Sequence, residues 1–504
     1  MSFIRKIKRN GRVYLAEVEN YRDGGKVKQR HLKYLGLSPE SNEDSFQLYS
    51  NDVTVDSVKV HGPIIVLESL ARELGLFEIL GDIAHPILTL TFAHCMNYRS
   101  VSETEKWYKS TDLASVFGCD EIKEDHLYDA ISRLSKYDFS YLEKSIFEKL
   151  TGIFGQDDSG VIYDGTNTYL TGSRSELAKM GKCKEGVKGR KLIQIGLGIT
   201  KTLGLPIFHQ VHAGNIHDTK MFNEAILRFS DIGTKNGLAV FDRGIASENC
   251  ISKLDAMGWK CLAGLPMHKG VKSAISNLDF DNLKNFRNLV LQGDTKLFVK
   301  SIPFKIGQTS GKLMILQNFL KKQRQTMDRM VAIEEAKQHI GTKPDLISDE
   351  IKKCFTASGK VNRHAVQRIE KLDGLSFIFT NAKLSQKEAV QHYFAKDLIE
   401  RCFRLSKSTL SLNPIRMQLD ENIKSHIMIC YLGLTLLTTV RLRLENKGIF
   451  RDPGEVLRSL DSIFKVYMTG EDSKTKSKMP FFKVNTLSNH QSSIIKIISP
   501  KIEM

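Results

Sequence analysis

Two aspartates stand where the carboxylates of an α/β protein can meet. Asp164 follows the apolar run 161–163, and Asp242 follows the apolar run 237–241. Each run has the composition of a buried strand, and a glycine that lets the chain turn comes one or two positions after each acid. Acids at the carboxyl ends of neighbouring strands lie at the edge of the sheet where such proteins bind ligands. The pair alone is weak evidence, because aspartate is also common in turns.

A third acid, Glu400, lies in a long stretch from residue 385 that predicts a helix. Four residues share one face of that helix, at successive spacings of three, four and seven: Tyr393, Lys396, Glu400 and Lys407. On such a face the carboxylate would bind a metal ion while the ammonium groups hold phosphate oxygens. The same spacing also fits a solvated helix with ion pairs between turns, and the periodicity does not choose between the two.

Together, the three carboxylates could form a site for divalent metal ions. Two metals about 4 Å apart can activate the attacking oxygen and stabilise the leaving oxygen in phosphodiester chemistry. Mg²⁺ fits because it prefers carboxylate and phosphate oxygens and keeps several waters, and Mn²⁺ is the expected substitute. On residue types and spacing alone, the candidate catalytic residues and metal ligands are Asp164, Asp242 and Glu400, and the interpretations as turn aspartates and a solvated helix stay open.

The composition indicates a globular protein that meets a polyanion. The chain has 504 residues, a hydrophobic fraction of 41% and a formal net charge of +17. That hydrophobic fraction is close to the one of ordinary globular proteins, so a sizeable core is expected. The excess of Lys and Arg favours a nucleic-acid partner, although a basic housekeeping enzyme would carry the same charge.

Secretion, disulfide scaffolds and membrane insertion are not favoured. The eight cysteines form no CxxC pair, which predicts a reduced, intracellular protein. The basic N-terminus lacks a following apolar segment, so no secretory signal is expected. The most apolar run, 427–440, is shorter than a membrane-spanning helix and predicts a buried core helix. We therefore expect a soluble cytoplasmic protein without a membrane partner.

The first third of the chain predicts two small units. Residues 1–50 form a basic β-hairpin unit, because an alternating run at 12–20 lies between turn signals. This unit is either a solvated hairpin or a strand platform for a phosphate backbone. Residues 60–150 have apolar residues at helical spacing. They are either a helical DNA-binding region or a plain packing domain.

The pattern then changes to that of a mixed α/β sheet. Helices are predicted at 218–229 and 247–257. The strand-like runs that surround them are 161–164, 192–200, 206–214, 237–242 and 259–265. Three consecutive strands followed by alternating helix and strand are typical of such a sheet.

A polar and basic stretch interrupts this pattern, and a strand-like run at 375–380 resumes it. The predicted domains are the α/β domain at 158–269 and 373–445, an insertion domain at 270–372, and a C-terminal tail at 446–504 that is a candidate for dimerisation. Basic spots at 321–324 and 352–353 are either a solvated face or contacts to a DNA backbone.

The residues around Glu400 resemble the Y-x2-R-x3-E-x6-K signature of bacterial and archaeal insertion-sequence transposases of the insertion sequence four superfamily. Tyr393, Glu400 and Lys407 match at the family spacing, and Lys396 stands where arginine is usual. Lysine keeps the charge but lacks the planar fork of a bidentate phosphate clamp.

Other segments resemble the family in the same order along the chain. They are the first acidic strand at 163–166, the G-N-x-x-D segment at 212–218 and the second acidic strand at 240–244. The long gap before Glu400 fits members that carry an inserted, mostly β domain. The basic N-terminal unit resembles one large subgroup, so the resemblance spans nearly the whole chain.

The resemblance implies a ribonuclease H-like mixed α/β sheet with an inserted α+β or β-rich domain, preceded by the small β unit and the helical DNA-binding region. It implies a DDE transposase that cleaves element ends and transfers strands to a target by cut-and-paste transposition. Two Mg²⁺ ions would sit on the triad, and no covalent intermediate with DNA would form. The expected partner is double-stranded DNA, as inverted-repeat ends and target. The protein is expected to act as a homodimer on DNA, associated with a bacterial or archaeal nucleoid.

Several further residues have two interpretations each. Tyr393, Lys396, Lys407 and Arg243 are the expected DNA- and phosphate-binding residues, although Arg243 fits a structural ion pair equally well. Asn215 and Asp218 either support the metal ligands from behind or have turn and helix-cap roles. The histidines of this region are expected to be structural, because their spacing does not match a metal site: His209, His212 and His217.

Two alternative functions stay open. The first is a metal-dependent nuclease or resolvase on the same fold, which would cut DNA without joining it. The second is an inactive, domesticated transposase that only binds DNA, and the complete triad argues against it. A hairpin intermediate also stays open, because neither Trp107 nor Trp259 lies in 270–372, where an aromatic base clamp would be expected.

Overall fold

The computed structural model describes residues 2–9, 12–23, 26–37, 53–96, 100–184, 186, 189–232, 237–280, 282–340, 344–471 and 478–502. The chain divides into two compact units. The smaller unit combines Met1–His61 with Ile463–Thr486, and the larger unit combines Gly62–Ser462 with Leu487–Met504. The predicted tail 446–504 is therefore divided between the two units.

The smaller unit consists of two three-stranded antiparallel sheets. One contains β1 (Ser2–Arg9), β2 (Arg12–Asp23) and β3 (Lys26–Leu37), and the predicted strand at 12–20 lies in β2. The other has the order β16–β15–β4. It pairs strands from both ends of the chain: β4 (Val53–Val60), β15 (Phe464–Glu471) and β16 (Lys478–Val484). Residues 38–50 of the predicted hairpin unit lie outside the described residues.

The larger unit begins with the predicted helical region. Its helices are α2 (Gly62–Glu73), α3 (Leu76–Leu80), α4 (Ala84–Met96), α5 (Val101–Ser110), α6 (Leu113–Phe117), α7 (Glu124–Leu134) and α8 (Phe139–Phe154). Asp138 begins α8 by accepting the backbone N–H groups of Ser140 and Tyr141. Such a cap satisfies donors that the first helical turn leaves without partners.

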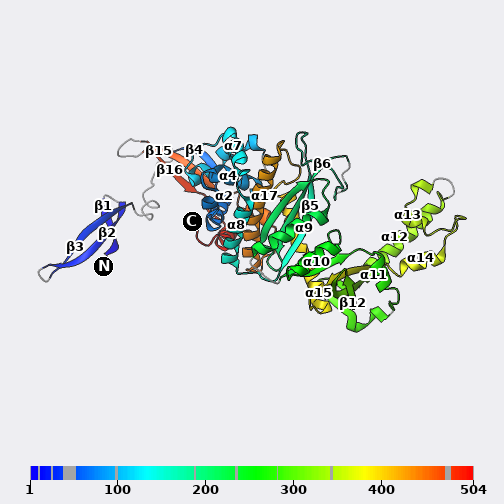
Figure 1. Cartoon of the computed structure of the whole chain (residues 1–504). Coiled ribbons are helices and arrows are strands. Elements are labelled where there is room, and N and C mark those ends of the chain that lie inside the picture. The colour runs from blue at the N-terminus through cyan, green and yellow to red at the C-terminus, as the bar shows by residue number, and fades with distance from the viewer. Residues whose placement is uncertain are drawn as a thin grey trace. The chain divides into compact units, whose positions relative to one another are not determined.

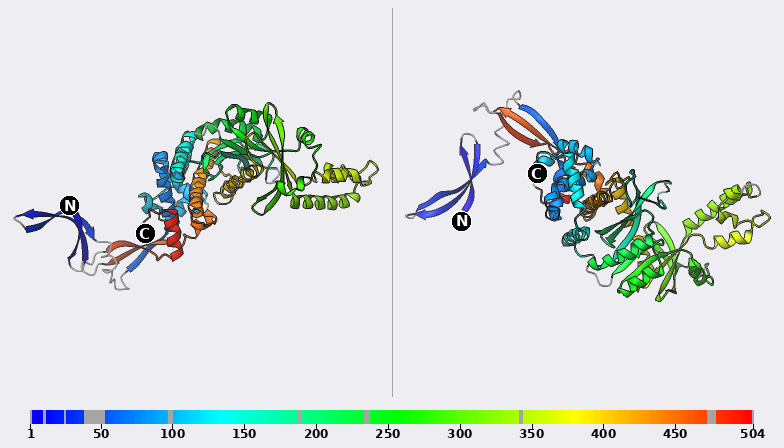
Figure 2. Two further views of the ribbon diagram at one scale, coloured as in Figure 1. Left: turned by 90° about the horizontal axis from the view of Figure 1, so that it is seen from below. Right: turned by 45° about the horizontal axis from the view of Figure 1, so that its top comes forward.

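A ten-stranded mixed sheet forms the rest of this unit, and Figures 1 and 2 show helices packed against it. Its order is β11–β12–β13–β14–β10–β9–β5–β7–β6, and β8 pairs with β7. The central strands match the predicted ones: β5 (Val161–Tyr169), β7 (Lys191–Thr200), β8 (Pro206–Ala213), β9 (Leu238–Phe241), β10 (Lys260–Leu265) and β14 (Leu375–Thr380). The helices α9 (Asp218–Ala225) and α10 (Glu248–Ala256) lie where helices are predicted. The mixed α/β class is confirmed.

The stretch predicted as an insertion is in part a continuation of this sheet. β11 (Leu289–Gln292), β12 (Thr295–Ile306) and β13 (Thr309–Asn318) extend it, and β13 pairs with β14. The apolar residues of β13 are buried, so this strand needs neighbours on both sides. The helices α12 (Phe319–Lys337), α13 (Asp349–Lys352) and α14 (Arg363–Glu370) follow β13 and lie outside the sheet. They surround a small core of their own that includes Ile333 and Phe355.

The chain leaves and re-enters the sheet at one point. The N–H of Asn318, at the end of β13, donates to the carbonyl of Gly374, just before β14, at 2.9 Å. Gly374 has φ +71°, and a Cβ there would overlap the carbonyl oxygen of Asn318. A glycine is therefore required where the two strands meet.

The longest helix is α17 (Asp420–Glu445), which forms the core of the larger unit. Two segments, Leu76–Met96 and Asp420–Glu445, are long and apolar enough to cross a membrane by length and composition. In their most apolar windows, 61% and 94% of residues are buried inside the protein. Buried core helices meet the same criterion, and α17 agrees with the core helix expected around 427–440.

Two histidines in this core predict a loss of stability in acid. His94 and His426 are each 4% exposed, their rings are 5.2 Å apart, and Cys430 Sγ is 3.9 Å from a nitrogen of each. Burial lowers the pKa of His94 to about 4, although a hydrogen bond to the carbonyl of Leu410 opposes the shift. Burial, and then the charge of His94, lower the pKa of His426 to about 3. Both side chains are therefore neutral in the folded protein at pH 5.

Unfolded histidines take up protons near pH 6.5, so folding stability should fall as the pH drops below that value. Each pH unit costs about 1.4 kcal/mol for each histidine that stays neutral. We expect the midpoint temperature of thermal unfolding to decrease when the pH is lowered from 7 to 5. The decrease should be smaller in His426→Gln than in wild type. Equal decreases in the two proteins would contradict the assignment.

Candidate active site

Parallel pairing of β5 with β9 places the first two acids side by side. The last paired residues of the two strands are Tyr163 and Phe241. Asp164 and Asp242 are the residues that follow them. Neighbouring strands are about 4.8 Å apart, and residues at the same register of parallel strands point to the same face. The structure thus brings the two aspartates together, and the charge of Asp242 acts on Asp164.

Asp164 does not end its strand, so that part of the prediction is wrong. β5 continues to Tyr169 because it pairs with β7 along its whole length. Asp164 lies opposite Leu197, and Gly165 lies opposite Gly196. Gly165 therefore lies within the continuing strand and not in a turn. The pairing of β5 with β9 ends at Tyr163, one residue before Asp164. Asp242, by contrast, directly follows the last residue of β9, as expected.

The predicted helix from residue 385 consists of two helices. α15 (Gln386–Phe394) begins at Ser385, which forms a reciprocal capping box with Glu388. α16 (Asp397–Ser408) follows after Lys396. Tyr393 therefore lies in the last turn of α15, Lys396 at the start of α16, and Glu400 and Lys407 in its first and last turns.

Asp242 is held by two side chains from this helical segment. The Tyr393 hydroxyl donates to Asp242 Oδ1 at 2.9 Å, and Lys396 Nζ donates to the same oxygen at 2.9 Å. The Lys396 ammonium also lies over the Tyr393 ring, 4.6 Å from its centre. Two residues of the Tyr393–Lys396–Glu400–Lys407 set therefore reach the second acid directly.

The two aspartates differ in their electrostatic environment. Burial raises the pKa of Asp164 above its ordinary value, although Lys184 and the N–H of Gly165 oppose the shift. Burial also acts to raise the pKa of Asp242. There, the charge and hydrogen bond of Lys396, with smaller contributions from Arg243 N–H and Tyr393, outweigh it and lower the pKa. Tyr393 has its own pKa raised by burial and by Asp242, so it stays a hydrogen-bond donor.

Gly264 in β10 makes room for these contacts. A Cβ at this position would overlap the Tyr393 hydroxyl, and it would lie 3.3 Å from Asp242 Oδ1 and 3.1 Å from Arg243 N. Only a residue without a side chain lets Tyr393 approach Asp242 over this strand. Gly264 is therefore part of the site, although it carries no chemistry of its own.

A second ion pair borders the first acid. Lys184 Nζ lies 3.1 Å from Asp218 Oδ2 and donates to the carbonyl of Gly165 at 2.6 Å. Asp218 is the first residue of α9. One of its carboxylate oxygens, Oδ1, lies 3.6 Å from the point where a Cβ on Gly165 would be. The other, Oδ2, lies 3.6 Å from the corresponding point on Gly244. Asp218 thus lies beside both acid-bearing segments, while the predicted Asn215 is exposed.

Glu400 is exposed in the first turn of α16, a helix that contacts β5. Within the described residues, no group of three or more His, Cys, Asp or Glu side chains is arranged to hold a metal ion. The donor chemistry nevertheless fits Mg²⁺, because two adjacent aspartates supply hard oxygen ligands and a third acid lies on a neighbouring helix. The pairing of β5 with β9 therefore places two acids of the predicted triad at one register, while Glu400 lies on a helix that contacts β5.

Comparison with known proteins now decides the family. Residues 155–436 match the family described as Transposase DDE domain, and residues 4–49 match the IS1634 family transposase N-terminal domain. The chain belongs to the DDE transposases. Its function is DNA transposition. A cryo-EM structure of the piggyBac transposase synaptic complex with hairpin DNA is similar at 11% identity and a TM-score of 0.37, with 79% of each chain covered. No curated protein matches the chain.

Two of the three histidines that the sequence analysis expected to be structural, His209 and His212, lie beside glutamates in this transposase. His209 is buried, and its Nδ1 lies at hydrogen-bond distance, 2.6 Å, from the acceptor Glu143 Oε1. Arg228 pairs with the other oxygen of Glu143 at 2.9 Å. His212 Nδ1 lies 3.7 Å from Glu224, and His217 precedes α9. Among the residues that the structure describes, none of the three belongs to a group of His, Cys, Asp or Glu side chains that could hold a metal ion.

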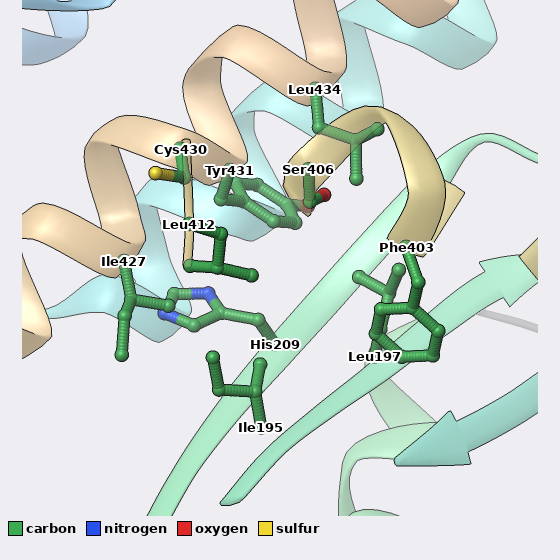
Figure 3. A pocket seen from close by; sticks show the side chains of 10 residues that line it. All are labelled: Ile195, Leu197, His209, Phe403, Ser406, Leu412, Ile427, Cys430, Tyr431 and Leu434. Atoms are coloured by element: carbon green, nitrogen blue, oxygen red, sulfur yellow. The ribbon is translucent and has the colours of Figure 1, made fainter. Parts of the chain in front are cut away.

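His209 also lines a small buried cavity of about 20 Å³ between the sheet and two helices of the transposase. Figure 3 shows Ile195 and Leu197 on the strand side, and Phe403 and Tyr431 on the helix side. This volume is about that of one water molecule. The cavity is therefore a packing gap of the core and not a substrate site.

The sequence analysis missed two residues of the site, Lys184 and Gly264. Gly264 could have been found, because a glycine inside an apolar strand often marks the close approach of another group. Lys184 follows a short strand, β6 (Lys179–Met180), in a basic loop that has no motif. No signal in the sequence connects this lysine to Asp164.

Proposed function

We propose that this transposase cleaves DNA at the ends of its element and joins the freed ends to target DNA, with Asp164, Asp242 and Glu400 as catalytic residues. The observation that carries the proposal is the position of Asp164 and Asp242 one residue past the last β5–β9 pair. Two acids on adjacent central strands, with a third acid on a following helix, are what a ribonuclease H-like sheet requires. The family match spans all three residues.

Two Mg²⁺ ions, or Mn²⁺ in their place, held by these carboxylates would supply Lewis acidity for phosphodiester cleavage. The residues of the chain prepare the site for this role. Tyr393 and Lys396 both bind Oδ1 of Asp242 and so fix the orientation of that carboxylate. The lowered pKa of Asp242 keeps it ionised, as a metal ligand must be.

The reaction has two steps at phosphorus. Water attacks the phosphodiester at the element end, the P–O3′ bond breaks, and a 3′-hydroxyl is released. That 3′-hydroxyl then attacks a target phosphodiester, so a new P–O bond forms as the target P–O3′ bond breaks. Neither step needs a covalent bond to the protein.

The same proposal assigns the DNA contacts. Lys407 and Arg243 would hold phosphates near the acids, and Arg243 is exposed for this role. Lys396, which the sequence analysis also expected to bind phosphate, is instead held by Asp242. The basic N-terminal β unit and the helices within 60–150 would bind the inverted repeats, since most of the affinity for DNA comes from phosphate contacts. We further propose that the protein acts as a homodimer on DNA in the cytoplasm, next to the nucleoid.

A joining assay tests the proposal. The purified chain is incubated with a duplex that carries the terminal inverted repeat of its own element, a supercoiled target plasmid and Mg²⁺. We expect joined products that contain both DNAs, and none when EDTA removes the metal.

Other products would identify the alternative functions. Nicked or cut DNA without joined product would favour a nuclease or resolvase. Binding of the repeat without cleavage would favour an inactive, domesticated transposase. Either result would reject strand transfer as the activity of this chain.

A further inference from the structure

Lys184 lies beside the first acid and comes from a loop outside the Tyr393–Lys396–Glu400–Lys407 set. Its ammonium group has three N–H donors. One is directed to the carbonyl of Gly165 at 2.6 Å and another to Asp218 Oδ2 at 3.1 Å. The side chain is 37% exposed, so the third donor can reach a ligand outside the protein. The charge of Lys184 also acts on Asp164.

The loop that carries Lys184 is anchored by one buried side chain. Asn167 of β5 is 1% exposed, and its Nδ2 donates to the carbonyl of Lys182 at 3.0 Å. Its Oδ1 accepts the N–H of Lys184 at 3.4 Å and faces Cys183 Sγ at 3.9 Å. An amide that directs its hydrogen bonds to three successive residues fixes the path of their backbone. Lys184 is therefore positioned before any ligand arrives, which lowers the entropic cost of binding.

The two lysines near the acids differ in how far their ammonium groups are committed to protein partners. Lys396 binds Asp242 and is 16% exposed, so its ammonium is largely committed to that acid. Lys184 binds Asp218 and the backbone, and it keeps both exposure and a donor. An ammonium group with this freedom, next to acids that act on a phosphodiester, suits a non-bridging phosphate oxygen.

We propose that Lys184 donates its third N–H to a non-bridging oxygen of the DNA phosphate on which Asp164 and Asp242 act, and that Asn167 positions Lys184 for this contact. The inference rests on the proposed function, because it needs DNA at these acids. It adds a phosphate-binding residue outside the Tyr393–Lys396–Glu400–Lys407 set. The competing interpretation is a purely structural ion pair between Lys184 and Asp218.

A thermodynamic cycle on binding separates the two interpretations. Duplexes of the element's own terminal repeat each carry one uncharged methylphosphonate in place of a phosphate. Their Kd values are measured with wild type and Lys184→Met, with Ca²⁺ in place of Mg²⁺ and a gel to show that no product forms. We expect the lysine variant and the neutral phosphate at the cleavage position each to weaken binding about tenfold. The two changes together should weaken binding no more than either change alone.

Additive effects at every phosphate would overturn the proposal, because a structural ion pair does not couple to one DNA position. Lys182→Met is the matched control, since it removes the same charge from the same loop and its side chain is exposed. In Lys182→Met, the effects of the variant and of each methylphosphonate on Kd should be additive at every DNA position. Lys184→Arg should restore part of the coupling.

Asn167→Ala tests the positioning role, after thermal unfolding has shown that the variant folds. The coupling is the factor in Kd by which the combined effect of Lys184→Met and the neutral cleavage phosphate departs from additivity. We expect Asn167→Ala to reduce this factor by at least about threefold. Unchanged coupling would remove Asn167 from the proposal. If wild type binds the repeat but joins no DNA, the proposed function fails, whereas additive cycles in an active enzyme make only the Lys184 inference fail.

Discussion

Glu400→Gln is expected to lower DNA cleavage and joining by at least about a thousandfold while the Kd for the terminal repeat changes by less than about threefold. Glutamine has nearly the shape of glutamate but is a neutral and poor ligand for Mg²⁺, so loss of a metal ligand should remove activity without removing the phosphate contacts. Asp242→Asn should have the same effect, because it removes the acid that Tyr393 and Lys396 hold. Single-turnover cleavage and gel-shift titration measure the two quantities.

Asp397→Asn is the matched control for Glu400→Gln. Asp397 is also an exposed acid in the first turn of α16, but it lies outside the signature spacing. It should keep cleavage within about threefold of wild type, as is usual for surface substitutions. Full cleavage by Glu400→Gln would show that the third acid is a different residue, and the exposed position of Glu400 makes this test decisive.

Gly264→Ala is expected to lower cleavage about a hundredfold although it adds only one methyl group. The new Cβ would overlap the Tyr393 hydroxyl, so either Tyr393 or the backbone of β10 must shift. Because Tyr393 donates to Asp242, the shift would misplace that carboxylate, and small displacements of reacting groups cost about this factor in rate. The measurement is the single-turnover rate at saturating DNA.

Two further variants show whether the loss comes from this contact. Gly264→Ala combined with Tyr393→Phe removes the hydroxyl that the methyl group meets, so the double variant should cleave faster than Gly264→Ala alone. Gly152→Ala, in α8, is a control because nothing lies within 4 Å of its added Cβ. It should leave activity unchanged and raise stability slightly, as alanine does in a helix. A double variant no faster than Gly264→Ala would refute the steric explanation.

The strands and helices around the acids could be predicted because their apolar residues repeat with the periods of regular structure. The runs that became β7, β8, β9 and β10 are bounded by glycine, proline or charged residues. The position of Asp164 within its strand was harder to predict. Gly165 has the composition of a turn signal, and only the partner strand β7, with Gly196 opposite, shows that the strand continues.

Long-range pairing explains most of what the sequence could not show. The stretch 289–318 was assigned to an insertion because it lies in a polar and basic region that interrupts the alternation of strands and helices, yet it extends the main sheet through β13. Lys184 reaches Asp218 and Gly165 across a loop, and no local pattern records such a contact. The signature around Glu400 identified the family, but it did not show that the segment bends between α15 and α16.

The hydrogen bond between Asn318 and Gly374 joins the two ends of the arm α12–α14 at the point where the arm meets the sheet. Because the two strands enter and leave side by side, the register of β13 with β14 does not depend on what lies between them. The arm also has a core of its own. A change in the length of the arm can therefore leave intact the pairing of the sheet that carries Asp164 and Asp242.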